Sequence, residues 1–303
     1  MPRILHRNDL HEIFAASAFF SRGHCRRQCR ASVVFRKDNM MRYIEEYYNS
    51  YDEDARLLSR HGQVEYLTTM KYIAEYLSGM AYPSIVEIGA GTGRYSVTLA
   101  KIGYKVTAID LVQKNIDIMR SKLDGTEDIN VMQGNALDLS YIEDNSFDLT
   151  MLLGPMYHLY TKKDKLRTLS EAVRVTRPGG HILVAYCMNE STVIQYIFGM
   201  ANPPKASDEE IFDKVTKNWR CMSLEEELFE MIRTEEIAEL DSYLPVERIK
   251  LIATDGATNY NRQVIDSMDD EMFEKWMSFH FATCERQDLV GASNHTLDIL
   301  RKL

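Results

Sequence analysis

A regular alternation of short apolar runs and amphipathic segments is the feature that most constrains the fold. Apolar runs typical of buried strands cover residues 85–88, 105–111, 130–133, 147–153 and 181–186, and helical patterns cover residues 94–102, 113–123 and 163–175. Such alternation is typical of parallel strands joined by helices that cover both faces of a sheet. The sequence therefore predicts an α/β fold with a mostly parallel sheet.

The segments on either side of this alternation differ from it. Residues 41–77 show helical periodicity, 177–180 predict a turn, 190–245 read as mostly helical, 246–253 and 296–300 as strands, and 269–286 as an amphipathic helix. We therefore divide the chain into an N-terminal extension over residues 1–39, capping helices over 40–80, a core over 81–189, a helical insert over 190–245, and a final part over 246–303 that carries the last strands and a second helical insert.

Charge separates the first 39 residues from the rest. They carry eight Lys and Arg against three acids, a net charge of +5. Because the whole chain has a net charge of −9, the remaining residues have a net charge of −14. A targeting peptide, a basic arm for nucleic acid and an extension outside the domain are three interpretations, and we favour the last, with residues 1–39 outside the folded domain. The acidic body argues against nucleic acid as the main partner.

Cysteine content and hydropathy suggest a cytoplasmic protein with no membrane span. No apolar run approaches the roughly 18–20 residues that a transmembrane helix needs. Five scattered cysteines suit a reducing compartment better than a disulfide framework. His24, Cys25 and Cys29 lack a second ligand pair at zinc spacing, so we expect no metal site.

A glycine-rich loop follows the first expected strand. It reads Glu87-Ile88-Gly89-Ala90-Gly91-Thr92-Gly93, a G-x-G-x-G spacing instead of the dinucleotide G-x-G-x-x-G. Glycines let the backbone turn tightly and let a ligand lie against it. Asp110 ends the second strand, where a carboxylate can accept both hydroxyl hydrogens of a ribose.

With these motifs the chain resembles the class I S-adenosylmethionine-dependent methyltransferases. The glycine loop, Asp110, Gly134-Asn135-Ala136, Phe147-Asp148 and Arg177-Pro178-Gly179-Gly180 stand in the family's order and spacing. The resemblance implies a Rossmann-like sheet of seven strands with the last strand antiparallel, a mostly helical lid, and S-adenosylmethionine as cofactor, with S-adenosylhomocysteine as product. It covers residues 41–187 and the last strand.

The resemblance also implies roles for individual residues. The glycines would carry the methionine part of the cofactor, Glu87 would lie beneath it, Asp110 would hold the ribose, and Leu111 would pack on the adenine. Asn135 stands where the family usually has aspartate, and together with the Ala136 N–H it would read the adenine edge. Glu87 could instead be a strand-end acid bonded to the loop. The cofactor-binding set is Glu87, Gly89, Ala90, Gly91, Gly93, Asp110, Leu111, Asn135, Ala136 and Leu153.

The acceptor is expected beyond the carboxyl end of the fourth strand, which reads Leu153-Gly154-Pro155-Met156-Tyr157-His158. Gly154 and Met156 break the Asn/Asp-Pro-Pro-Tyr motif that some amino-group methyltransferases carry, which argues against planar exocyclic amines. His158 titrates in a range that suits a general base, and Tyr157 could contact the substrate. We take Tyr157 and His158 as the catalytic candidates and Cys187 as an ordinary buried cysteine.

The segments outside the minimal core are expected to gather over the strand ends and form the acceptor pocket. Candidate acceptor-binding residues are Tyr47, Tyr51, Arg56, His61, Trp276, His280 and Arg286, with Glu65 and His295 as further possibilities. The sequence thus predicts a cytoplasmic methyltransferase, monomeric or homodimeric, that acts on a small molecule. An RNA or protein methyltransferase and a cofactor-binding protein without catalysis are the alternatives.

Overall fold

The structure, a computed structural model, describes residues 43–50, 59–199, 215–222 and 228–303. The chain divides into two units, residues 1–42 and Tyr43–Leu303, and all described residues belong to the second. The predicted extension over residues 1–39 and the candidates Tyr51 and Arg56 lie outside the described residues.

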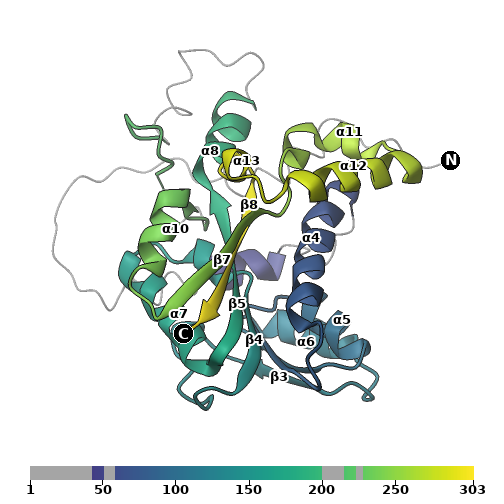
Figure 1. The fold of residues 1–303 in the computed structure, drawn as a ribbon, viewed down its shortest axis with the longest axis vertical. Helices are drawn as coiled ribbons and strands as arrows, with labels where there is room; N and C mark the ends of the chain where they lie inside the picture. Colours follow the sequence, from purple (N-terminus) through teal and green to yellow (C-terminus); the bar gives the residue numbers. More distant parts are fainter. Residues whose placement is uncertain (1–42, 51–58, 200–214, 223–227) are drawn as a thin grey trace. The chain divides into compact units, whose positions relative to one another are not determined.

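A single mixed sheet forms the centre of this unit (Figure 1). Its main path runs β3-β2-β1-β4-β5-β8-β7, and along this path β8 runs in the opposite direction to the other six strands. The predicted mostly parallel sheet with an antiparallel last strand is confirmed. The seven strands are β1 (Ser84–Ile88), β2 (Lys105–Asp110), β3 (Ile129–Gln133), β4 (Phe147–Leu152), β5 (Thr176–Met188), β7 (Val246–Ala253) and β8 (His295–Lys302).

Helices cover both faces of the sheet because successive strand residues point in opposite directions. Ile85 packs with residues of α4 (Arg60–Leu77) and α5 (Arg94–Lys101), whereas Val86 packs with residues of α7 (Lys162–Val175) and α10 (Thr234–Asp241). α6 (Gln113–Ser121) shares the face of α5, where Met119 and Val97 enclose Ala108. Each such fully buried aliphatic side chain contributes about 1.5–3 kcal/mol to folding.

Helix starts are fixed by side-chain caps. Ser59, Thr161 and Asp269 accept hydrogen bonds from backbone N–H groups in the first turns of α4, α7 and α12. Such a cap typically contributes about 1 kcal/mol. The remaining helical elements are η1 (Pro155–His158), α8 (Asn189–Thr192), η2 (Val193–Phe198), η4 (Thr258–Asn261), α11 (Arg262–Asp266), α12 (Asp270–Thr283) and α13 (Gln287–Val290).

Two predictions about β5 and its surroundings were wrong. Residues 177–180 were predicted as a turn before the strand, but β5 already starts at Thr176. Phe147 pairs with Thr176 and Leu149 with His181, so residues 177–180 bulge from the ladder, with Gly179 at a φ of +78°. An eighth strand, β6 (Met231–Ile232), pairs in parallel with the end of β5 and was not predicted.

Helix boundaries needed further correction. In the described part of residues 190–245, helix covers the start of the segment and α10, while a bridge between Val215 and Cys221 and strand β6 interrupt it. The predicted helix over 269–286 ends at Thr283 and is followed by the short α13. Over 41–77, helix is seen at residues 43–50 and in α4.

Among the described residues, no helix combines the length and the apolar character needed to cross a bilayer.

Candidate functional site

The glycine loop after β1 adopts a backbone that side chains would prevent. Gly89, Gly91 and Gly93 have φ angles of +76°, +53° and +83°, in the left-handed region that favours glycine. A Cβ on Gly89 would lie 2.5 Å from Cδ of Pro155, and one on Gly93 would lie 2.5 Å from Cγ of Met119. Local sterics therefore require glycine at both positions and leave a bare backbone surface beside η1.

The loop is tied to the neighbouring strand by its own backbone. The N–H groups of Gly89 and Ala90 both donate to the carbonyl of Ile109, at 2.8 and 2.9 Å. Asp110, the next residue, accepts from the N–H of Gly91 at 2.7 Å through Oδ2. The end of β2 thus fixes the loop conformation, and α5 begins immediately afterwards at Arg94.

Asp110 is buried and already holds three donors. Besides Gly91, the N–H of Val112 and the side-chain amide of Asn115 donate to Oδ1, at 2.8 and 3.1 Å. Burial raises the pKa of Asp110, and these three bonds oppose the rise. A carboxylate offers about four lone-pair sites, so Oδ2 can accept one further donor.

Glu87 is 1% exposed and bonds to the first turn of α5. Its Oε2 accepts from the N–H of Ser96 at 2.9 Å and from the Ser96 hydroxyl. Burial raises the pKa of Glu87 to about 8, the Ser96 bonds lower it, and the charge of Asp110 adds to the rise. These contacts match the alternative of an acid bonded within the loop region, with Ser96 as its partner.

The remaining cofactor candidates surround the ends of β2, β3 and β4. Leu111 follows Asp110 and is half-buried, as is Leu153 after β4. Oδ1 of Asn135 accepts from the N–H of Leu137 at 2.9 Å, so this oxygen already forms a local turn. Ala136 is partly buried and packs against the large hydrophobic core cluster.

The catalytic candidates lie in η1, directly beside the glycine loop. The ring of Pro155, the first residue of η1, closes against Gly89, as the Cβ contact shows. Tyr157 donates its hydroxyl to the carbonyl of Leu153 at 2.9 Å. His158, at the end of η1, is 8% exposed.

Both ring nitrogens of His158 have partners. Nδ1 lies 2.8 Å from the carbonyl oxygen of Leu228, which can only accept, so Nδ1 carries the proton. Nε2 is then the acceptor for the hydroxyl of Tyr48, 3.0 Å away. Burial lowers the pKa of His158 to about 4 against the effect of the Leu228 bond, so the ring is neutral at pH 7.

Aromatic rings surround this pair. Phe229 lies 5.4 Å from His158, 5.9 Å from Tyr157 and 6.0 Å from Tyr47, measured between ring centroids. Tyr47 and Tyr48 are 5.1 Å apart in an edge-on arrangement. The helix over residues 43–50 therefore supplies two members of an aromatic cluster at the end of β4.

Lys114 holds the same helix from the other side. Its Nζ donates to the carbonyls of Asn49 and Tyr48, at 2.8 and 3.3 Å, and a lysine there also complements the helix C-terminus. Lys114 follows β2 and His158 follows β4, and β1 lies between these two strands. The helix over residues 43–50 is therefore bound on both sides of the strand that carries the glycine loop.

The other predicted acceptor-binding residues fall into two groups. Trp276 donates to Thr258 Oγ1 at 3.1 Å, and His280 lies against Gly256, so both lie at the loop after β7. Burial lowers the pKa of His280, whose Nε2 has no hydrogen-bond partner among the described residues. In the second group, His61 pairs with Asp266, and the exposed Arg286 pairs with Asp288.

Several residues of this site were not predicted as members. Tyr48 and Lys114 are such residues, as are Ser96, Asn115 and Phe229, which touch the candidates directly. Tyr48 stands in the tyrosine-rich segment that the sequence analysis singled out, next to the candidate Tyr47. Nothing in the sequence pairs it with His158, which is 110 positions away.

A parallel sheet with a glycine loop after its first strand and an acid after its second is an architecture that binds nucleoside cofactors. Residues 86–184 match the family model described as a methyltransferase domain. The demethylmenaquinone methyltransferase of Clavibacter sepedonicus is 28% identical over 156 residues, which span 51% of this chain and 60% of that protein. The match thus covers less than two thirds of the relative.

Solved structures share the fold. A S-adenosylmethionine-dependent methyltransferase from Thermotoga maritima, a possible histamine N-methyltransferase, is 18% identical, with a TM-score of 0.52 over 87% of this chain and 100% of that one. Phosphoethanolamine N-methyltransferase 1 of Haemonchus contortus is 15% identical, with a TM-score of 0.57 over 90% of this chain and 50% of that one. Residues 86–184 of this chain therefore match a methyltransferase domain, in a fold that S-adenosylmethionine-dependent methyltransferases share, and S-adenosylmethionine is the cofactor that this similarity implies.

The residues present fit that cofactor. The three glycines leave a backbone surface that any Cβ would fill at Gly89 and Gly93. Asp110 retains an acceptor position on Oδ2 for a hydroxyl group.

Proposed function

We propose that the chain is a methyltransferase that acts on a small-molecule acceptor, held between the helix over residues 43–50 and the glycine loop. The observation that carries this proposal is the position of the Tyr48–His158 pair, beside the loop at the end of β4. Ligands of open α/β sheets bind at the carboxyl ends of the strands, where both features lie.

The cofactor would be held by the residues of the loop and its neighbours. Gly89, Gly91 and Gly93 would carry its amino-acid part, Asp110 would accept from the ribose, and Leu111, Leu153 and the segment of Asn135 and Ala136 would enclose the adenine. When bound, S-adenosylmethionine supplies a methyl group activated by a positively charged sulfur. The protein then has to orient the acceptor and exclude water.

Tyr48 and His158 would orient the acceptor. The Tyr48 hydroxyl donates its hydrogen to Nε2 of His158, so toward an O–H or N–H group of the substrate the phenol oxygen would act as a hydrogen-bond acceptor. His158 acts as a positioning residue, because its Nδ1–H bond to Leu228 fixes the tautomer. A neutral ring is the form that can accept from Tyr48, and the low pKa keeps it neutral at physiological pH.

Three observations favour a small acceptor. The acidic body disfavours polyanions, with a net charge of −14 outside the first 39 residues. The aromatic cluster around His158 offers rings rather than basic side chains. One relative is named as a demethylmenaquinone methyltransferase, and one structural neighbour is in complex with phosphoethanolamine. Demethylmenaquinone and phosphoethanolamine are both small molecules.

Incubation with methyl-labelled cofactor and separate small-molecule, RNA and protein fractions tests the proposal. Label is expected in the small-molecule fraction. Label in RNA or protein alone would overturn the acceptor class, and cofactor binding without transfer to any fraction would overturn the enzymatic assignment.

The Tyr48→Phe variant tests the orienting pair once an acceptor is known. Removing the hydroxyl should lower kcat about 100-fold, because the acceptor loses its alignment, while cofactor affinity stays unchanged. Tyr243→Phe is the matched control, because its hydroxyl bonds to Lys162 on the surface of α7. Equal kcat in the two variants would contradict the role of Tyr48.

A further inference from the structure

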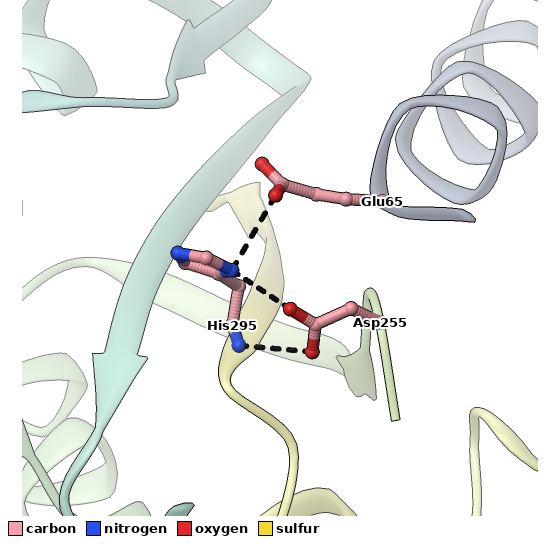
Figure 2. Close-up of side chains that lie close together, drawn as sticks. All are labelled: Glu65, Asp255 and His295. Atoms are coloured by element: carbon pink, nitrogen blue, oxygen red, sulfur yellow. Dashed lines mark hydrogen bonds and ion pairs between the residues drawn. The ribbon is translucent and has the colours of Figure 1, made fainter. Parts of the chain in front are cut away.

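Three potential metal ligands converge where β7 ends and β8 begins (Figure 2). Glu65 belongs to α4, Asp255 follows β7, and His295 is the first residue of β8. One ligand atom from each lies within 4.8 Å of the other two. Nδ1 of His295 is 2.8 Å from Oδ2 of Asp255 and 3.4 Å from Oε2 of Glu65.

More carboxylates approach Nδ1 of His295 than its one hydrogen needs as acceptors. Nδ1 of His295 carries at most one hydrogen, and Asp255 alone would satisfy it. The Glu65 carboxylate nevertheless points at the same nitrogen, as Figure 2 shows. Two carboxylates and one imidazole thus surround a single point, an arrangement that a cation would satisfy better than a single proton.

Neighbouring groups hold Asp255 in place for such a role. Oδ1 accepts from the hydroxyl of Ser293 at 2.6 Å and from the N–H groups of Asn294 and His295, at 2.9 and 3.1 Å. The side-chain amide of Asn259 donates to Oδ2 at 2.5 Å. Metal ligands are typically oriented by partners of this kind, and here Asp255 is 1% exposed.

The charges of the cluster suit a cation. Two carboxylates, those of Glu65 and Asp255, approach one imidazole nitrogen in a buried place. They would attract a divalent cation by Coulomb interaction.

We propose that Glu65, Asp255 and His295 bind one divalent transition-metal ion, with Zn²⁺ as the best fit. Zinc accepts imidazole nitrogen and carboxylate oxygen at about 2.0–2.2 Å, which places tetrahedral ligand atoms about 3.3 Å apart. The separations of 2.8 and 3.4 Å bracket that value. Three protein ligands leave one coordination position open, and the ion would link α4 to β8 and to the loop after β7.

The sequence analysis predicted no metal because these ligands are 190 and 40 positions apart in the chain. The proposal is independent of methyl transfer, since it concerns only metal binding.

Zinc titration of the full chain after dialysis against a chelator tests the proposal. Wild type is expected to bind one more equivalent of Zn²⁺ than Glu65→Gln, and Zn²⁺ is expected to raise the Tm of wild type only. Gln keeps the size of the half-buried side chain, so the variant should fold. Cobalt substitution should give visible d–d absorption that Glu65→Gln loses.

Two further variants make the result specific. Asn259→Ala should weaken Zn²⁺ binding about 10–100-fold, because it removes the bond that orients the Asp255 oxygen. Asp266→Asn is the matched control, because it breaks the His61–Asp266 pair, which holds a similar 2.7 Å contact at the start of the same helix. Equal zinc affinity and equal Tm response in wild type and Glu65→Gln would overturn the proposal.

Discussion

Two carboxylates near the carboxyl ends of the strands are equally buried, yet their pKa values are shifted in opposite directions. Glu87 and Asp255 are each 1% exposed. Burial raises the pKa of Glu87 to about 8, the charge of Asp110 adds to the rise, and Ser96 is its donor among the described residues. The pKa of Asp255 is lowered despite burial, because His295, Ser293, Asn294 and Asn259 donate to the carboxylate and offset the cost.

The difference shows that partners, and not depth, decide the ionisation state of a buried acid. It also separates two kinds of site. The glycine-loop region is built from backbone conformation and backbone N–H groups of nearby residues. The region around Asp255 is built from side chains that three distant segments bring together.

The largest expected effect is in the glycine-loop region. Gly93→Val should destabilise the protein by about 2–5 kcal/mol, because it adds left-handed strain to a clash with Met119. Gly103→Val is the control, since Gly103 has a φ of +98° but no neighbouring atom within 4 Å of a Cβ. Thermal unfolding should show the greater loss for Gly93→Val, and equal losses would contradict the steric argument.

Glu87→Gln should show how the ionisation of Glu87 affects the stability of the fold. The unfolded chain releases the Glu87 proton near pH 4.5 and the folded chain near pH 8, so ionisation destabilises the fold progressively as pH rises between these values. The variant should therefore gain stability over wild type with rising pH, on the order of 3 kcal/mol by pH 8. Denaturant unfolding at several pH values measures it.

Asp255→Asn provides the contrast for this titration. The pKa of Asp255 is lowered on folding, so its stabilisation is complete above the unfolded pKa and is lost only as pH falls below it. The deficit of Asp255→Asn should stay flat between pH 4.5 and 6.5, where the gain of Glu87→Gln rises. Parallel pH profiles would remove the distinction between the two regions.

Asp110→Ala should weaken S-adenosylmethionine binding by about 1–3 kcal/mol, through loss of charge-assisted hydrogen bonds. Isothermal titration measures the change, and thermal unfolding separates it from loss of the bonds to Gly91 and Val112. Asp117→Ala, which removes an exposed acid of the neighbouring helix, is the control. Unchanged affinity in a folded Asp110→Ala protein would count against the role of this residue.

Deletion of residues 1–39 should have the smallest effect. Residues Tyr43–Leu303 form a compact unit of their own, so Tm and cofactor affinity should remain those of the full chain. Differential scanning fluorimetry and titration with the cofactor check this outcome. Loss of folding would show that the domain boundary lies earlier in the chain.

The parts of the molecule that sequence reasoning predicted are the parts that short segments determine. β1, the glycine loop and α5 follow one another within eighteen residues, and the turn needs glycine for local steric reasons. The apolar runs predicted the mostly parallel sheet in the same way, whereas the antiparallel last strand was expected from the family resemblance. The bulge at residues 177–180 was missed because its pairing depends on the register between β4 and β5.

The contacts that complete the sites were out of reach of that reasoning. His158 was singled out as titratable, but its neutral state depends on burial, and its tautomer depends on Tyr48 and on the carbonyl of Leu228, 110 and 70 positions away. Asp255 has no local motif that distinguishes it from any other acid after a strand. Its role depends on Glu65 and His295, which only the packing of α4 against the β7–β8 edge brings near.

The reversed direction of β8 has a consequence for engineering. Ala253, the last residue of β7, pairs with Thr296 near the start of β8. The chain therefore leaves the sheet and returns to it at neighbouring residue pairs of the two strands. Residues 254–294 thus form an insertion anchored at two neighbouring points of the sheet. Exchanging it would alter the surroundings of the strand ends while β1 to β4 and their loops stay as they are.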